Sequence, residues 1–334
     1  MRMGDESQFG RIGQPEVNEI PWSPPAWVPA HWSPRPRRRW YNSLPFHLAL
    51  FLLTVLTTLI VGTHIALNYA QNLSIFDWDV FLPYFRDLWR HPASLLLGVP
   101  FSFTLLSILL AHELGHYLTC RHYGIRATYP YFIPAPTLIG TLGAFIRIKS
   151  PIMNRRELFD VGISGPIAGF VVAVPALILA IFLTKGTMPF ISPDSSSMDK
   201  PLAVILLAKL FRSGINPAEI ISHPVGCAAW IGFFATALNL LPVGQLDGGH
   251  ILYAVLGDKS RNISRGFLLV LLPLGYFWPG WIVWTVILLF LGLRHPQLIE
   301  PVEPLGRNRK ILAVVAAVIL VLTFIPAPFN IQWR

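Results

Sequence analysis

The sequence predicts an all-α polytopic membrane protein with six or seven transmembrane helices and, near its functional site, a small membrane-associated β-hairpin or sheet. Of the 334 residues, 53% are hydrophobic and only 13% are charged, whereas a soluble domain has about 25% charged residues. The apolar residues also gather in runs that approach or exceed the roughly 18 to 20 residues that a bilayer-spanning helix needs. These runs cover residues 45–69, 96–118, 158–184, 226–246, 266–293 and 310–327.

The segment before the first run, 1–44, is rich in Pro, Trp and Arg and has no continuous apolar stretch. We expect a mostly disordered cytoplasmic tail, because such a composition buries too little apolar surface to fold. The segment also lacks the apolar h-region of a signal peptide and the features of an organellar transit peptide. The absence of both kinds of targeting signal favours the cytoplasmic membrane of a prokaryote as the location.

Basic residues indicate how the chain is oriented in the bilayer. The Arg-rich stretch 35–39 precedes the first apolar run and therefore places the N-terminus in the cytoplasm. Counting the runs puts the basic segments 121–157, 256–265 and 294–310 on the same side, provided that 266–293 forms a helical hairpin. The formal net charge of +9 then indicates contact with anionic lipid of the bilayer, and no nucleic acid is expected as a partner.

The hairpin itself is predicted by the sequence FWPGW at 277–281, which interrupts the fifth run. Proline cannot continue the hydrogen bonding of a helix, and tryptophan favours the membrane interface. Two short helices that meet at an interface raise the number of membrane segments from six to seven.

The second run contains SILLAHELGHYLTC, residues 107–120, where ionisable side chains stand among apolar ones. A charge at membrane depth costs roughly 2.5 to 3.5 kcal/mol on insertion scales, so such groups usually face a protein interior and have a function. His112 and His116 lie on one face of a helix, one turn apart, with Glu113 beside them. This H-E-x-x-H pattern is typical of two zinc-binding imidazoles and a glutamate that acts as general base. The alternative is a chance motif with structural hydrogen bonds only.

A catalytic zinc usually has three protein ligands, so a third ligand is expected elsewhere in the chain. Asp247 in NLLPVGQLDGGH is the best candidate, because Pro242 and Gly244 break the helix before it and Gly248 and Gly249 permit a tight turn after it. The alternative is that Asp247 caps the helix that follows or forms an Asp-Gly turn. Weaker candidates for the third ligand are His250, Asp160, Glu157, His223 and His122.

With these residues in place, the sequence resembles the site-2 protease family of intramembrane zinc metalloproteases. The resemblance covers roughly residues 96–256. It rests on HELGHYL at 112–118 and NLLPVGQLDGGHIL at 239–252, with PYFIPAP, GTLGAFIRIKSP and GISGPIAG between them. Many family members carry a PDZ domain between the two metal motifs. No folded domain of that kind is evident here, which argues against substrate selection by a soluble peptide-binding module.

The resemblance implies that His112, His116 and Asp247 coordinate Zn²⁺ and that Glu113 activates a water molecule. It also implies that Asn239, in the family's N-x-x-P spacing with Pro242, orients the substrate or stabilises the oxyanion. Without the resemblance, Asn239 is a buried polar residue that bonds a neighbouring helix.

The segment 138–151 alternates glycine, small and apolar residues, which suggests short strands. Similar segments in the family form a membrane-associated hairpin beside the active site, where an exposed edge can hold the substrate as an added strand. The alternative is an ordinary cytoplasmic loop. Gly165 and Gly169 form a small-x-x-x-small pair that predicts close packing against the helix of the H-E-x-x-H motif.

Together these features predict a zinc metalloendopeptidase that hydrolyses peptide bonds in or near transmembrane segments of membrane-protein substrates. The alternative is a polytopic metal-ion transporter or a non-proteolytic membrane scaffold. We expect four parts: the tail 1–44, a first helix and external loop 45–95, the zinc metalloprotease core 96–256, and C-terminal helices 257–334. The sequence does not indicate an oligomeric state.

Overall fold

A computed structural model of the chain describes residues 40, 43–75, 84, 86, 88, 90–186, 198–292 and 304–329. The predicted N-terminal tail lies almost entirely outside these residues. The helices are α1 (Leu44–Ala70), η2 (Pro92–Gly98), α3 (Val99–His122), α4 (Arg155–Leu183), α5 (Leu202–Phe211), α6 (Pro217–Ser222), α7 (Pro224–Leu240), α8 (Asp247–Leu256), η3 (Gly257–Lys259), α9 (Ser260–Leu274), α10 (Gly280–Leu291) and α11 (Arg307–Thr323). The strands are β1 (Tyr131–Pro134) and β2 (Thr141–Phe145).

Three of these helical stretches are long and apolar enough to cross a membrane. They are α1 with 27 residues, η2 and α3 together with 31, and α4 with 29. Their length follows from uninterrupted apolar sequence, since 20 residues of α-helix already span about 30 Å. The predicted runs 45–69, 96–118 and 158–184 are confirmed as such helices, and the chain is a mostly helical membrane protein.

The remaining predicted runs form shorter helices. Helix α7 has 17 residues and ends at Leu240, before Pro242 and Gly244, where the sequence predicts the break. Pro242 lacks an amide hydrogen, and Gly244 adopts a positive φ of 52°, which together end the helix. The fifth run is divided into α9 and α10 near the predicted break. Helix length therefore does not confirm the count of six or seven spans.

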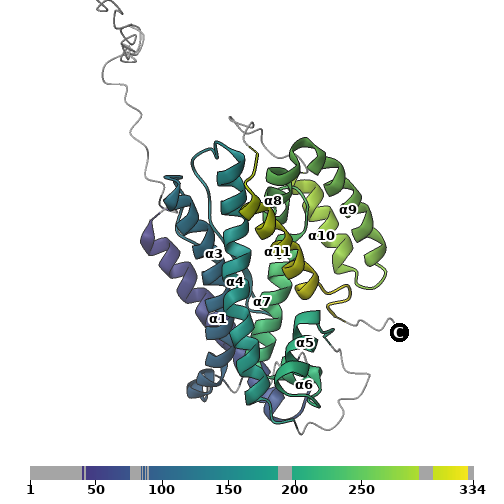
Figure 1. Cartoon of the computed structure of the whole chain (residues 1–334). Coiled ribbons are helices and arrows are strands. Elements are labelled where there is room, and N and C mark those ends of the chain that lie inside the picture. Colours follow the sequence, from purple (N-terminus) through teal and green to yellow (C-terminus); the bar gives the residue numbers. More distant parts are fainter. Residues whose placement is uncertain are drawn as a thin grey trace, which may run out of the picture. The chain divides into compact units, whose positions relative to one another are not determined.

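The main hydrophobic core lies among α3, α4 and α7, which pack against one another in every pairing and lie side by side in Figure 1. Its fully buried side chains include Phe101, Leu105, Leu177, Trp230 and Phe233. Helix α8 also packs on α4. Helix α4 is therefore the element against which both halves of the predicted site are placed.

A two-stranded antiparallel sheet follows α3. It pairs Tyr131 with Phe145 and Phe132 with Ala144, so a sheet is confirmed, although only one strand falls within the predicted segment 138–151. The other strand lies upstream, because the turn that joins the strands occupies the residues around Gly140. The hydroxyl of Thr57 donates to the carbonyl of Gly140 at 2.6 Å, which fastens this turn to the middle of α1.

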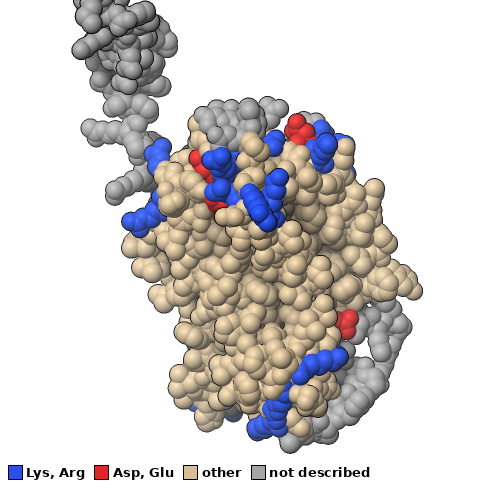
Figure 2. Space-filling model, in the orientation of Figure 1, with Lys and Arg blue, Asp and Glu red and all other residues tan. Residues whose placement is uncertain are grey.

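Charged side chains gather at the ends of the bundle. Figure 2 shows a broad band free of Lys, Arg, Asp and Glu on the face that it presents, with most of the Lys and Arg at one end. Helix α3 ends, and α4 and α11 begin, at that end of Figure 1. The basic residues at these helix termini, among them Arg121, Arg156 and Arg307, therefore share one side, as the sequence predicts.

Candidate metal centre

Helix α3 presents His112 and His116 on one face. Both side chains are buried, and their Nε2 atoms lie 3.1 Å apart. Glu113, the next residue round the helix, is also buried, and its carboxylate accepts a hydrogen bond from the backbone amide of Ile146, just beyond β2. The helical spacing of the motif therefore produces the arrangement that the sequence predicts.

Asp247 reaches the same point from the first residue of α8. Its Oδ2 atom lies 3.2 Å from Nε2 of His112 and 3.3 Å from Nε2 of His116. The N-cap residue of α8 is Leu246, so Asp247 does not occupy the capping position that the alternative assigns to it. Among the described residues, His112, His116 and Asp247 form a group of side chains that is close enough to hold one metal ion.

The hydrogen bonding of His116 indicates that a cation belongs between its ring and Asp247. Its Nδ1 atom lies 2.7 Å from the carbonyl oxygen of Val161, and because a carbonyl only accepts, Nδ1 carries the hydrogen. The Nε2 atom of neutral His116 therefore presents a lone pair to the carboxylate of Asp247, which is also an acceptor. Two buried acceptors that face each other repel unless a cation lies between them.

The three separations also suit one small cation. Ligand atoms about 2.0 to 2.1 Å from a tetrahedral zinc lie about 3.3 Å from one another. The separations in the cluster are 3.1, 3.2 and 3.3 Å. Two imidazoles and one carboxylate form a donor set typical of catalytic zinc, and a backbone carbonyl that accepts from Nδ1 of a ligating histidine is its usual support.

Glycine on α4 makes room for the cluster. A Cβ atom on Gly165 would collide with the ring of His116, and one on Gly169 would lie 3.3 Å from Cβ of His112. On the opposing helix, a Cβ on Gly115 would lie 2.5 Å from the carbonyl oxygen of Ser164. The predicted close packing of Gly165 and Gly169 against the motif helix is confirmed.

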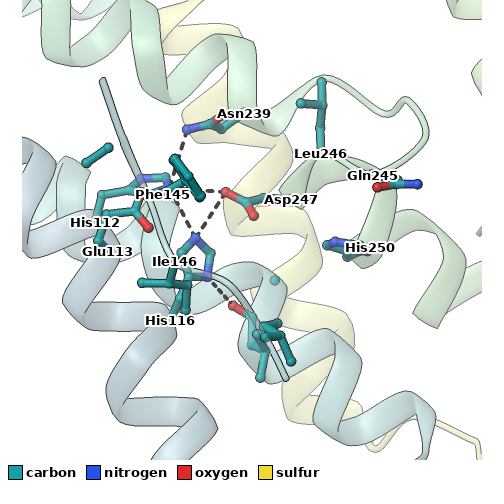
Figure 3. A pocket seen from close by; sticks show the side chains of 14 residues that line it. His112, Glu113, His116, Phe145, Ile146, Asn239, Gln245, Leu246, Asp247 and His250 are labelled. Carbon is teal, nitrogen blue, oxygen red and sulfur yellow. Dashed lines mark hydrogen bonds and ion pairs between the residues drawn. The ribbon is translucent and has the colours of Figure 1, made fainter. Parts of the chain in front are cut away.

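Asn239 borders the cluster from α7, and its Nδ2 atom lies 3.3 Å from Nε2 of His112. Figure 3 shows its amide on one side of His112 and the Asp247 carboxylate on another. All five predicted site residues line one cavity of about 240 Å³, together with Phe145, Gln245 and His250 among others. The cavity therefore has room for a reacting group beside the cluster.

The weaker candidates for the third ligand have other roles or positions. His250 lines the cavity, whereas His122 is exposed at the end of α3. Asp160 binds Arg309 through two hydrogen bonds. Glu157 lies in the first turn of α4, and it accepts hydrogen bonds from the Met153 backbone and the Asn154 side chain. His223 caps the N-terminus of α7 through Nδ1.

Sequence reasoning missed the contacts made by backbone groups. The carbonyl of Val161 sets the tautomer of His116, and the amide of Ile146 holds Glu113. Backbone groups are present at every residue, so no residue type marks them in a sequence. Only the neighbouring glycine pattern on α4 indicates that main chain approaches the motif closely.

Comparison with known proteins assigns this helix bundle to a family. The profile of Peptidase family M50 matches residues 100–276, which is more than half of the chain and includes all five predicted site residues. The chain therefore belongs to peptidase family M50, the site-2 protease family, as the resemblance of its motifs implies. Membership in this family implies zinc as the metal.

The chain is also similar to curated plant proteins. It is 31% identical over 299 residues to the probable zinc metalloprotease EGY1, chloroplastic, of Arabidopsis thaliana, covering 84% of this chain and 52% of that protein. It is 28% identical over 239 residues to the probable zinc metalloprotease EGY2, chloroplastic, of the same plant, covering 70% of this chain and 42% of that protein. The chain thus spans about half the length of the curated relatives that it matches.

Proposed function

We propose that the chain is an intramembrane zinc metalloendopeptidase that hydrolyses peptide bonds in or near transmembrane segments of membrane proteins. The observation that carries this proposal is the meeting of His112, His116 and Asp247 beside Glu113. Both histidines and Glu113 lie on α3, which is long and apolar enough to cross a membrane. Family membership and the printed names of the plant relatives support the same activity.

In this proposal, Nε2 of His112, Nε2 of His116 and a carboxylate oxygen of Asp247 hold the zinc. When bound, zinc supplies a Lewis acid that lowers the pKa of water and polarises a substrate carbonyl. Val161 orients the ring of His116 through Nδ1. Gly165 keeps the space that this ring occupies.

Glu113 is the general base. Its carboxylate lines the same cavity as the three ligands, so it accepts a proton from the attacking water and later gives that proton to the leaving amine. The amide of Ile146 restrains the carboxylate beside the cavity. Water reaches the site through the part of the cavity that Gln245 and His250 line.

We assign Asn239 the role of a hydrogen-bond donor to the substrate. Its side-chain amide lies next to His112 and supplies an N–H donor toward the oxygen that gains charge in the transition state. A donor of this kind contributes about 10²- to 10³-fold to the rate. Truncation to Ala should therefore lower kcat while the zinc content stays unchanged.

The proposed membrane topology adds further membrane segments to the three long helices. We propose that α7 and α11 also cross the bilayer and that α9 and α10 enter it as a hairpin, which restores the six or seven membrane segments that the sequence predicts. The N-terminus then lies on the cytoplasmic side. The division into a first helix 45–95, a core 96–256 and C-terminal helices 257–334 also belongs to this proposal.

The plant relatives are named as chloroplastic, so they do not support the prediction of a prokaryotic cytoplasmic membrane. The coarser statement that the chain is a membrane protein does not depend on that prediction. A metal transporter or a membrane scaffold is less well supported, because neither role needs Glu113 beside the ligands.

The test is the replacement Glu113→Gln in the full chain, reconstituted in liposomes with a set of synthetic transmembrane peptides. We expect the wild type to cleave at least one peptide, and the variant to retain zinc while losing about 10²- to 10⁴-fold of the rate. The matched control is His122→Ala, a change at the exposed end of the same helix, which should leave both readouts unchanged. Retained cleavage in Glu113→Gln would refute the assigned base, and zinc transport without cleavage would favour the transporter.

A further inference from the structure

One short stretch of α4 contacts both halves of the proposed metal centre. The carbonyl of Val161 accepts the hydrogen on Nδ1 of His116 at 2.7 Å. At the next residue, Gly162, an added Cβ would lie 3.0 Å from Cβ of His250 and 3.3 Å from the carbonyl oxygen of Asp247, both on α8. The position of this backbone therefore affects a ligand from α3 and the start of the helix that carries the third ligand.

Asp160, the residue before Val161, is held by side chains from two other elements. Nε and Nη2 of Arg309, in the first turn of α11, donate to its Oδ1 at 2.8 Å and to its Oδ2 at 2.6 Å. The hydroxyl of Tyr123, just beyond the end of α3, donates to the same Oδ2 at 2.5 Å. An arginine that binds a carboxylate through two parallel bonds fixes its orientation as well as its distance. Both oxygens of Asp160 are therefore restrained.

Tyr123 and His116 attach α3 to this stretch of α4 at two points. They are seven residues apart, which corresponds to two helical turns and about 10 Å, so they project from the same side of α3. One point is the bond between His116 and Val161, and the other is the bond between Tyr123 and Asp160. Two bonds to adjacent residues of α4 fix its position along α3, whereas one bond leaves the two helices free to pivot.

Glycine packing does not fix this position by itself. Gly115 on α3 and Gly165 on α4 let the two helices approach closely. Such contacts set the separation of two backbones, but hydrogen bonds are directional and also set how far one backbone is shifted along the other. The carbonyl of Val161 belongs to the backbone, so it moves with this stretch of α4. A shift there therefore changes the bond on which the orientation of the His116 ring depends.

We propose that Asp160 and Arg309 are positioning residues of the metal centre. Arg309, together with Tyr123, holds Asp160 in the place that keeps the carbonyl of Val161 on Nδ1 of His116. Arg309 lies on α11, beyond the residues 100–276 that match the family, so the support of the ligand extends outside the family profile. The inference rests on the proposed function, because the ligand that it concerns belongs to the proposed zinc site.

The connection between the ion pair and the metal acts in both directions. Bound zinc fixes the ring of His116, which holds Val161 and thereby keeps Asp160 beside Arg309. Because the coupling between two sites is reciprocal, zinc should strengthen the ion pair as much as the ion pair strengthens zinc binding. The stability coupling of Asp160 and Arg309 in a double-mutant cycle should therefore be larger in the zinc-loaded protein than in the metal-free protein. Equal coupling in the two forms would overturn the inference.

The main test is the zinc affinity of the detergent-purified full chain, measured by competition with a coloured chelator. Asp160→Asn and Arg309→Gln should each weaken zinc binding about fivefold, less than the tenfold or more that loss of a direct partner of a ligating histidine costs. The double variant should lose little more than either single variant, because both changes release the same carboxylate. Tyr123→Phe, which removes one hydroxyl and keeps the ring, should weaken binding about twofold.

Two control variants separate positioning from general stability. Arg212 donates to the carbonyl of Ile181 near the other end of α4, so Arg212→Gln also removes an arginine that fastens this helix, about 30 Å along it from Asp160. It should lower thermal stability and leave zinc affinity unchanged. Arg307→Gln, at an exposed position in the first turn of α11, should change neither. An equal loss of zinc affinity in Arg212→Gln would overturn the inference, because the effect would then be a general loosening of α4.

Cobalt(II) in place of zinc gives a readout of ligand geometry instead of stability. The visible spectrum of bound cobalt depends on how its ligands are arranged, so Asp160→Asn should change the spectrum at full occupancy and Arg212→Gln should not. Wild-type affinity and a wild-type spectrum in both Asp160→Asn and Arg309→Gln would overturn the inference while the proteolytic function stands. If these variants bind zinc more weakly but the wild type cleaves no transmembrane peptide, the positioning role is retained and the proteolytic function is overturned.

Discussion

Gly165 of α4 lies directly against the imidazole of His116, where a Cβ atom would collide with the ring. This contact couples the glycine pattern of one helix to a proposed metal ligand on another. The ligand position therefore depends on a residue that has no chemistry of its own.

The first prediction concerns this contact. Gly165→Ala should lower the zinc affinity at least tenfold, because the ring of His116 must leave the position in which Nδ1 meets Val161. Zinc titration of the purified protein measures the effect. The control is Gly266→Ala on α9, where an added Cβ meets nothing within 4 Å. Full zinc affinity in Gly165→Ala would show that the ring is not confined.

The second prediction concerns the ion pair between Asp160 and Arg309. Nε and Nη2 of Arg309 lie 2.8 and 2.6 Å from the two carboxylate oxygens, and the hydroxyl of Tyr123 donates to the same carboxylate at 2.5 Å. The pair therefore fastens the start of α11 to α4 and to the end of α3.

A double-mutant cycle with Asp160→Asn and Arg309→Gln tests this fastening. We expect a coupling of about 1 kcal/mol, because the geometry is bidentate although both side chains are partly exposed. Thermal unfolding in detergent provides the measurement. Strictly additive effects of the two changes would mean that the pair does not stabilise the junction.

The third prediction concerns pH. His223, between α6 and α7, has its pKa lowered to about 4 because burial disfavours the protonated form. The unfolded chain takes up this proton near pH 6.5 and the folded chain only near pH 4, so stability is fully present above pH 6.5 and is lost as the pH falls across that interval.

His223→Asn separates this effect from capping, because asparagine also accepts from the amide that Nδ1 of His223 now caps. The variant should lose less thermal stability than the wild type between pH 6.5 and 4. Equal losses in the two proteins would contradict the assignment of the proton to His223.

Much of the site could be predicted because its side chains are marked by spacing. His112 and His116 are one helical turn apart, and Asp247 stands beside helix-breaking residues. The structure brings these three side chains together, and their binding of zinc stays a prediction. The backbone contacts of the site could not be predicted in the same way, since the carbonyl of Val161 and the amide of Ile146 are marked by no residue type.

The fold was predictable where apolar sequence is long and uninterrupted, as in α1, α3 and α4. The fold was less predictable where tertiary contacts decide which secondary structure forms. The strand Tyr131–Pro134 forms because it pairs with β2 and packs on α1, and its own sequence ends in proline. The ion pair between Asp160 and Arg309 joins residues far apart in the chain. No local sequence pattern indicates such a contact.

The most direct test of the central claim is the zinc content of the detergent-purified full chain. The wild type should hold about one zinc per chain, and both His116→Ala and Asp247→Ala should lose it, because the two residues face the same point from different helices. His122→Ala, at the exposed end of α3, should retain the metal. A wild type without zinc, or an Asp247→Ala variant that holds zinc as firmly as the wild type, would contradict the account.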